Sequence, residues 1–131
     1  MLVETSAIVA ILLEEPEAGD FLARLNAAER PATSIVNKIE AALAVGRAIT
    51  DYPLATRLVA EFLNEVGVTI LPVPVDIYDD VMAAYAAFGK GVGHKAQLNF
   101  GDCFSYAFAK RAATPLLFKG NDFAQTDLGN N

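Results

Sequence analysis

Four carboxylates stand where the chain passes between predicted elements of secondary structure, and they are the residues most able to do chemistry. They are Glu4, Glu40, Asp102 and Asp122, with Asp127 as an alternative for the last of them. Hard divalent cations such as Mg²⁺ bind oxygen ligands, usually one or two carboxylates with water and phosphate in the remaining positions. If the fold brings these acids together, the sequence predicts a divalent-metal site.

A bound Mg²⁺ or Mn²⁺ lowers the pKa of a coordinated water and offsets negative charge on a phosphate that is being displaced. Without a cation, clustered carboxylates repel one another and raise each other's pKa. The sequence has no zinc-ligand spacing, no phosphate-cradling glycine loop and no Ser/His/Asp arrangement. The acids therefore favour metal-assisted chemistry at a phosphate over zinc or nucleotide-dependent chemistry.

Each acid also has a purely structural interpretation. Glu4 follows an apolar strand and precedes a helix, where helix N–H groups stabilise a carboxylate without any catalytic purpose. Glu40 lies in a largely apolar helix, where it faces either a polar cleft or solvent. Asp102 lies three residues after Asn99 and has the spacing of a helix-capping residue. Asp122 belongs to Gly120-Asn121-Asp122, an ordinary turn sequence.

The elements that must position these acids alternate between strand and helix. Short apolar strands are predicted at 1–3, 32–33, 68–71 and 115–118. Helices are predicted from Ala7 with Thr5 or Ser6 as the cap, after Pro16, after the caps Ser34 and Asp51, around 77–88, and from Phe100 after the cap Asn99. The glycine-rich stretch 89–94 is predicted to be a loop.

Strands separated by helices of this length pair in parallel through right-handed crossovers. The strands near Glu4 and Asp122 are almost wholly apolar, as strands covered on both faces should be. The sequence therefore predicts an α/β fold, a three-layer α/β/α sandwich with a central, mostly parallel sheet. In such folds, ligands bind at the carboxyl ends of the strands. We expect a single domain over residues 1–131.

Composition limits the environment and the partners. The chain has 131 residues, of which 53% are hydrophobic and 20% charged, so it can bury a core without disulfides. A single cysteine, Cys103, and the lack of a long apolar run predict a cytoplasmic protein that does not enter a membrane. The net charge of −6 argues against nonspecific nucleic-acid binding. That objection is limited, because cations bound to the acids would neutralise part of the charge.

Four segments, in their order along the chain, resemble the VapC-type toxins of the PIN-domain family. They are Val3-Glu4-Thr5-Ser6-Ala7, the helix containing Glu40-Ala41-Ala42, the stretch Leu98-Asn99-Phe100-Gly101-Asp102-Cys103-Phe104-Ser105-Tyr106-Ala107, and Leu116-Leu117-Phe118-Lys119-Gly120-Asn121-Asp122-Phe123. The resemblance spans nearly the whole chain. It is therefore more specific than any single motif.

The resemblance implies a Mg²⁺- or Mn²⁺-dependent endoribonuclease that cleaves an RNA substrate and is inhibited by a cognate VapB-like antitoxin. By position, Glu4 and Asp102 correspond to the family's metal ligands, while Glu40 and Asp122 complete the acidic site and orient water. The resemblance also implies a homodimer. Ser105 and Tyr106 lie at helical spacing from Asp102, where they line the same cleft or belong to the core.

One residue departs from the family pattern, because the first acid of PIN domains is ordinarily Asp and this chain has Glu4. The additional methylene moves the carboxylate by about 1.5 Å, whereas Mg²⁺ requires near-octahedral geometry. An alternative hypothesis is therefore a catalytically weakened PIN module that binds antitoxin or RNA without efficient cleavage. A phosphoacceptor receiver domain is a third hypothesis, disfavoured because Asp102 stands at a helix start instead of a strand end.

Overall fold

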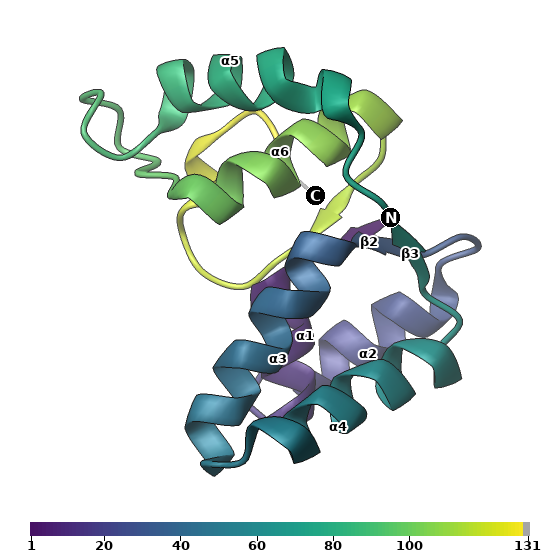
Figure 1. Cartoon of the computed structure of the whole chain (residues 1–131). Helices are drawn as coiled ribbons and strands as arrows, with labels where there is room; N and C mark the ends of the chain where they lie inside the picture. Colours follow the sequence, from purple (N-terminus) through teal and green to yellow (C-terminus); the bar gives the residue numbers. More distant parts are fainter. Residues whose placement is uncertain (130–131) are drawn as a thin grey trace.

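A parallel sheet lies between two layers of helices in the computed structural model, which describes residues 1–129 (Figure 1). The strands are β1 (Leu2–Val3), β2 (Ala32–Ser34), β3 (Thr69–Leu71) and β4 (Leu116–Leu117). Their order across the sheet is β3-β2-β1-β4, and every neighbouring pair is parallel. The predicted α/β/α sandwich is confirmed.

The helices agree closely with the periodicity of the sequence. They are α1 (Thr5–Leu12), α2 (Ala18–Ala27), α3 (Ile35–Ile49), α4 (Tyr52–Glu65), α5 (Tyr78–Phe88) and α6 (Phe100–Ala112), with the 3-10 turns η1 (Val75–Ile77) and η2 (Phe123–Gln125). Ser34, Asp51 and Asn99 cap α3, α4 and α6 with their side chains, as predicted. Local capping chemistry therefore fixes the start of three helices.

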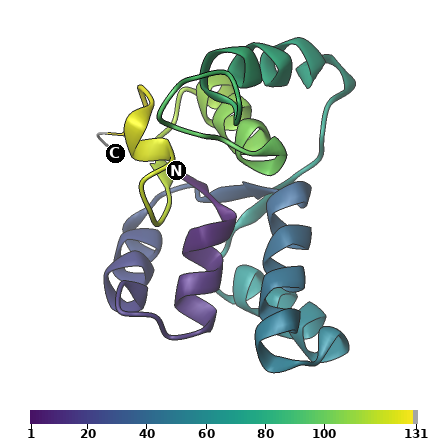
Figure 2. The same cartoon turned by 90° about the vertical axis from the view of Figure 1, so that its left-hand side faces the viewer.

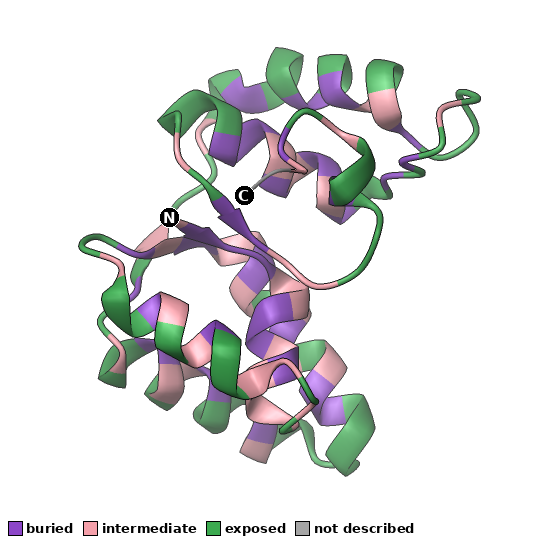
Figure 3. Ribbon diagram, turned by 180° about the vertical axis from the view of Figure 1, so that it is seen from behind, coloured by how far each residue is buried: buried purple, intermediate pink, exposed green. Residues whose placement is uncertain are grey.

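Each face of the sheet has its own hydrophobic core (Figures 2 and 3). On one face, Leu2 and Leu116 pack with buried residues of α5 and α6. On the other, Val3 and Leu117 pack with α1 to α4. Successive strand residues point to opposite faces, so even the two-residue strands β1 and β4 contribute to both cores. The strands β1 and β4 are wholly buried, as their apolar sequences predict, whereas the edge strand β3 is half-buried to exposed.

The start of α1 differs from the prediction. The helix begins at Thr5 and not at Ala7, and its N-cap is Glu4 instead of Thr5 or Ser6. Glu4 has extended backbone geometry, and its carboxylate accepts from the Ser6 N–H at 2.8 Å. A glutamate is an uncommon cap, so the sequence pattern favoured the nearby hydroxyl residues.

No helix within residues 1–129 is long and apolar enough to cross a membrane.

Candidate metal-dependent active site

Glu4 is a buried acid at the carboxyl end of β1, with only 4% of its surface exposed. Its Oε2 accepts hydrogen bonds from the N–H and the hydroxyl of Ser6. Burial raises the pKa of Glu4 to about 7, the Ser6 hydrogen bonds oppose this rise, and the negative charges of Asp102 and Glu40 add to it. The negative charges of two other predicted site acids therefore act on Glu4, although each of these acids comes from a different helix.

Glu40 lies on α3 and reaches toward the starts of α1 and α6. Its Oε1 accepts from the Thr5 hydroxyl at 2.8 Å. Its Oε2 lies against Gly101, where a methyl group in place of the glycine hydrogen would overlap the carboxylate. A larger residue at position 101 would therefore have to displace the Glu40 carboxylate from its present place against α6.

Asp102 stands in the first turn of α6 and forms a capping box with Asn99. The Asp102 N–H donates to the Asn99 side chain at 2.8 Å, and the Asn99 N–H donates to Asp102 Oδ2 at 3.0 Å. Burial is the main influence that raises the pKa of Asp102, and the charges of Asp122 and Glu40 raise it further, against the opposing effects of the Asn99 bond and Lys90. The capping interpretation is correct, yet the same carboxylate also faces two other acids.

The structure favours Asp122 over Asp127 as the late acid of the site. Asp122 is exposed at the start of η2, after β4, and its charge acts on Asp102. Asp127 is held elsewhere: one oxygen accepts from the Tyr106 hydroxyl at 2.6 Å and the other from Lys110 at 2.7 Å. Tyr106 packs against the hydrophobic core, one of its two predicted roles, and its hydroxyl also holds Asp127.

Three further polar or titratable residues of the same region, Cys103, Ser105 and His94, have structural roles. Cys103 is buried, and burial raises its pKa to about 11, so the thiol stays protonated at neutral pH. Ser105 is fully buried behind the acids and accepts from Asn37 at 2.8 Å. His94 packs edge-on against Phe88 and accepts from the Ala96 N–H.

Sequence reasoning missed two neutral contacts and one cation around the acids. Ser6 holds Glu4, and its hydroxyl accepts from the Lys119 N–H at 2.9 Å, which ties α1 to the segment after β4. Asn37 lies behind Thr5 and donates to its hydroxyl at 2.9 Å. Lys90 lies close enough to Asp102 to lower its pKa. The two-residue spacing of Glu4 and Ser6, typical of a side-chain turn, was the available signal for the first contact.

The donor set fits a hard divalent cation. Its members are carboxylates, which Mg²⁺ and Mn²⁺ prefer, and two of them have pKa values raised by burial and by like charge. Within residues 1–129, no three His, Cys, Asp or Glu side chains gather closely enough to hold an ion by themselves. The arrangement therefore suits Mg²⁺ held by one or two carboxylates and completed by water and phosphate.

The chain matches the PIN domain family over residues 1–128. It therefore belongs to the PIN-domain family, and the resemblance seen in the four segments is confirmed.

Individual relatives of this chain are named as VapC ribonucleases. The chain is 40% identical to Ribonuclease VapC30 of Mycobacterium tuberculosis and to VapC ribonuclease Mb0640 of Mycobacterium bovis, in each case over 98% of this chain and 95% of the relative. It is 38% identical to Ribonuclease VapC42 of Mycobacterium tuberculosis, over 98% of this chain and 96% of the relative.

Two solved structures share the fold at low sequence identity. Mycobacterium tuberculosis VapC20, described as a toxin that cleaves the sarcin–ricin loop, superposes with a TM-score of 0.71 at 17% identity, covering 94% of this chain and 92% of that one. A chain of a toxin–antitoxin complex from Klebsiella pneumoniae superposes with a TM-score of 0.67 at 16% identity, covering 94% and 89%. These likenesses establish the PIN-like architecture.

Proposed function

We propose that this protein is a divalent-metal-dependent endoribonuclease and the toxin of a toxin–antitoxin pair. The observation that carries the proposal is the placement of Glu4, Glu40 and Asp102 near one another in a PIN-domain chain, where the charge of Glu40 acts on both Glu4 and Asp102. Relatives 38–40% identical over nearly the whole chain are named ribonucleases of the VapC kind. They support the function predicted from the sequence, and no observation favours the weakened module or the receiver domain.

Glu4 and Asp102 would hold Mg²⁺ or Mn²⁺, which when bound supplies an activated water and offsets charge on the phosphate. Glu40 accepts from Thr5 and packs on Gly101, and its carboxylate would accept a hydrogen bond from the attacking water. Asp122 lies on the exposed side of the cluster, where it completes the acidic pocket next to Asp102. The four acids therefore divide into two that hold the ion and two that orient water.

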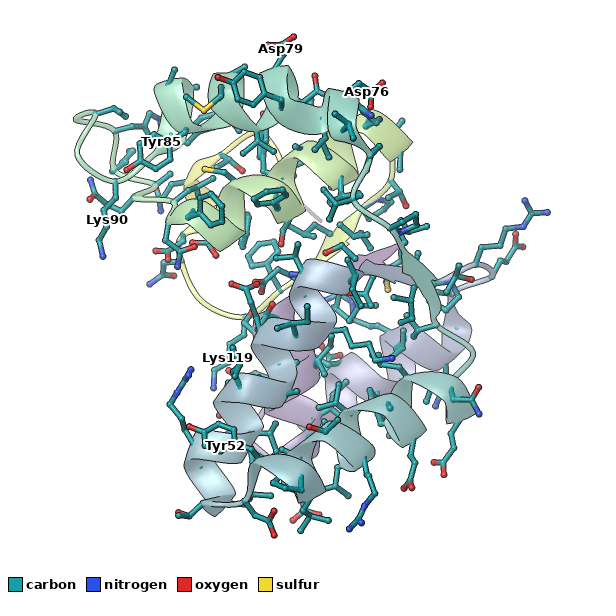
Figure 4. All side chains as sticks on the ribbon, in the orientation of Figure 1. Tyr52, Asp76, Asp79, Tyr85, Lys90 and Lys119 are labelled. Atoms are coloured by element: carbon teal, nitrogen blue, oxygen red, sulfur yellow. The ribbon has the colours of Figure 1, made fainter. Side chains whose placement is uncertain are left out.

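Lys90 supplies a positive charge where the RNA must enter. It lies on the loop after α5 (Figure 4), and its backbone N–H donates to the Leu98 carbonyl at 2.8 Å, four residues before Asp102. The ion pairs within residues 1–129 occupy Lys110, Arg111 and Lys119 and do not include Lys90. In a chain with a net charge of −6, Lys90 is suited to contact a phosphate next to the acids.

Two exposed apolar surfaces support the proposed homodimer and antitoxin complex. One surface, around η1, α5 and the start of α6, includes Val75, Tyr78 and Phe100, which are 95%, 69% and 71% exposed. The other lies between α3 and α4 and includes Ile39 and Tyr52. Exposed apolar patches of this kind mark protein-binding sites. Light scattering of Phe100→Ser and Ile39→Ser would show which surface forms the homodimer.

RNA cleavage by the purified protein tests the proposal directly. We expect cleavage in Mg²⁺ or Mn²⁺, no cleavage in excess chelator, and recovery when the metal is restored. Cleavage that is undiminished in chelator would contradict a metal-dependent nuclease.

Cytoplasmic location follows from the proposed RNA substrate and agrees with the single buried thiol of Cys103.

A further inference from the structure

Behind Glu40 lies a group of polar side chains that the proposed function does not use. Ser34, Asn37 and Ser105 are all 0% exposed, although each carries groups that are costly to bury without partners. They come from the end of β2, the first turn of α3 and the second turn of α6. Thr5, at the start of α1, connects them to Glu40.

The hydrogen bonds form one continuous chain that ends at the acid. Ser34 Oγ donates to Asn37 Oδ1 at 2.8 Å, and Asn37 Nδ2 donates to Thr5 Oγ1 at 2.9 Å. The Thr5 hydroxyl then donates to Glu40 Oε1 at 2.8 Å. Every partner in this series is within ordinary hydrogen-bond distance.

The donor-to-acceptor direction of this series of hydrogen bonds is fixed where Ser34 meets Asn37. The backbone N–H of Asn37 donates to Ser34 Oγ at 3.0 Å, so the Ser34 hydroxyl directs its own proton to Asn37 Oδ1. The Asn37 amide nitrogen must then face Thr5 and Ser105, to which it donates. Since an amide nitrogen only donates, the Thr5 hydroxyl accepts from it and is left with its single proton for Glu40.

The second N–H of Asn37 reaches the other side of Glu40. It donates to Ser105 Oγ at 2.8 Å, and Ser105 Oγ in turn lies 3.5 Å from the carbonyl oxygen of Gly101. Gly101 is the residue against which Glu40 Oε2 packs. The same amide group thus holds both the hydroxyl that binds one oxygen of Glu40 and the helix turn that confines the other.

We infer that Asn37 is a positioning residue for Glu40. Oriented by Ser34, its side-chain amide commits the Thr5 hydroxyl to donate to the carboxylate and holds the first turn of α6 against it. This inference rests on the proposed function, because the orientation of Glu40 matters only if Glu40 acts in the site. Neutral groups that orient an active-site ligand typically change activity 10–100-fold when they are removed.

Thr5→Val is the first test, since it keeps the shape of the side chain and removes only the hydroxyl. Thr33→Val is the matched control, because the Thr33 hydroxyl is buried and donates to the Val3 carbonyl, away from Glu40. With Mg²⁺ and a model RNA, we expect Thr5→Val to lower kcat about 10–100-fold with little change in KM. Thr33→Val should keep the kcat of the native protein, and Thr5→Ser should restore most of the lost rate.

A double variant separates positioning from general damage. If Thr5 acts through Glu40, then Thr5→Val should cause no further loss in a Glu40→Gln background, because effects of residues that act as a unit are not additive. If Thr5→Val lowers kcat by the same factor in the Glu40→Gln background as in the native protein, the inference is overturned. An unchanged kcat in Thr5→Val, or a Glu40→Gln variant as active as the native protein, would also overturn it.

A measurement without metal or RNA tests the same chain of hydrogen bonds. The side-chain amide signals of Asn37, assigned by their loss in Asn37→Ser, should shift in the NMR spectrum of metal-free Thr5→Val and stay in place in Thr33→Val. Unmoved signals in Thr5→Val would contradict the link. If the native protein does not cleave RNA at all, the proposed function fails, whereas a failure of the Thr5 tests in an active enzyme removes only the role of Asn37.

Discussion

Two groups of acids in this protein have opposite surroundings. On the surface, Asp76 and Asp80 pair with Arg111, Asp127 with Lys110, and Glu15 and Glu17 with Lys119. In the candidate site, Glu4, Glu40 and Asp102 are held by hydroxyl and N–H groups, and these ion pairs within residues 1–129 include none of the three.

The pKa values follow this division. Hydrogen bonds to Arg111 lower the pKa of Asp76, and those to Lys110 and Tyr106 lower the pKa of Asp127. Burial and neighbouring negative charge raise the pKa values of Glu4 and Asp102. The fold pairs the surface acids with cations, where pairing contributes little stability, whereas the ion pairs within residues 1–129 include neither Glu4 nor Asp102, and only the more distant charge of Lys90 acts on Asp102. This difference supports the proposal that the site binds a cation from outside the chain.

The substitution Asp102→Asn is the most direct test of the difference between the surface acids and the acids of the candidate site. This change removes one proposed metal ligand, while the asparagine oxygen still accepts from the Asn99 N–H. We expect RNA cleavage in Mg²⁺ to fall by more than about 100-fold. The metal-free protein should melt at the same or a higher temperature, since repulsion with Glu4 and Glu40 is relieved. Cleavage at the native rate would contradict the proposed role of Asp102.

The two groups should also give opposite dependences of stability on pH. The pKa of Glu4 is about 7 in the folded protein, against an ordinary value of 4.5, so the folded state binds more protons between these values. Without metal, the free energy of unfolding should therefore decrease as pH rises from about 4.5 to about 7, by as much as about 3 kcal/mol.

Asp76 and Asp127 have lowered pKa values, so their contribution to stability is present above pH 4 and is lost as pH falls below it. Urea unfolding of the metal-free protein across pH 3–8 measures both slopes. Glu4→Gln should flatten the slope between pH 4.5 and 7, and Mg²⁺ should stabilise the native protein more at pH 7.5 than at pH 5. If the free energy of unfolding of Glu4→Gln has the same slope between pH 4.5 and 7 as that of the native protein, another group titrates in this range.

Glu4→Asp probes the departure from the family pattern. The shorter side chain still reaches helix N–H groups, because aspartate is a good N-cap, and it moves the carboxylate back toward the usual PIN position. We expect the Mg²⁺-supported kcat/KM to rise about 10-fold and the preference for Mn²⁺ to shrink, in line with the strict geometry of Mg²⁺. Parallel assays in the two metals measure this change. A fall in both rates would mean that the site is adapted to glutamate.

Lys90→Ala should weaken RNA binding moderately. Loss of one phosphate contact is expected to raise KM about 3–10-fold at low salt, with little effect on kcat, and to reduce the salt dependence of kcat/KM by about one unit of slope. Lys110→Ala is the matched control, because Lys110 is already paired with Asp127. If Lys90→Ala and Lys110→Ala lose affinity for RNA equally, the net charge of the protein determines binding and a specific contact of Lys90 does not.

Asp127→Asn should have the smallest effect on activity. Its carboxylate binds Tyr106 and Lys110, so its removal leaves the acids near Asp102 in place. We expect kcat and KM within about twofold of native, together with a small loss of stability typical of an exposed ion pair. A large loss of kcat would show that Asp127, and not Asp122, is the late acid of the site.

Periodicity and capping predicted the architecture well. Each predicted strand and helix is present, because apolar spacing and the caps Ser34, Asp51 and Asn99 act locally. The predicted start of α1 was wrong because the N-cap is Glu4, a residue proposed as a metal ligand and not a typical capping residue.

The acids themselves could be predicted, but their supporting contacts could not. Asn37 lies 32 residues from Thr5 and 68 from Ser105, and these contacts exist only when three elements pack together. Likewise, Glu15 and Glu17 pair with Lys119, which lies more than 100 residues away in the chain.

The position of β4 next to β1 sets the order in which the toxin can mature during synthesis. The Glu4 N–H donates to the Leu117 carbonyl, and the Lys119 N–H donates to the Ser6 hydroxyl that holds Glu4. Glu4 is therefore held in part by contacts that span 113 residues of the chain, and pairing over such a separation is slow to form. A ribosome-bound nascent chain that lacks residues 114–119 carries Glu4, Glu40 and Asp102 but lacks the contacts that Leu117 and Lys119 make with Glu4 and Ser6. The nuclease should thus stay inactive until β4 has been made and has paired with β1.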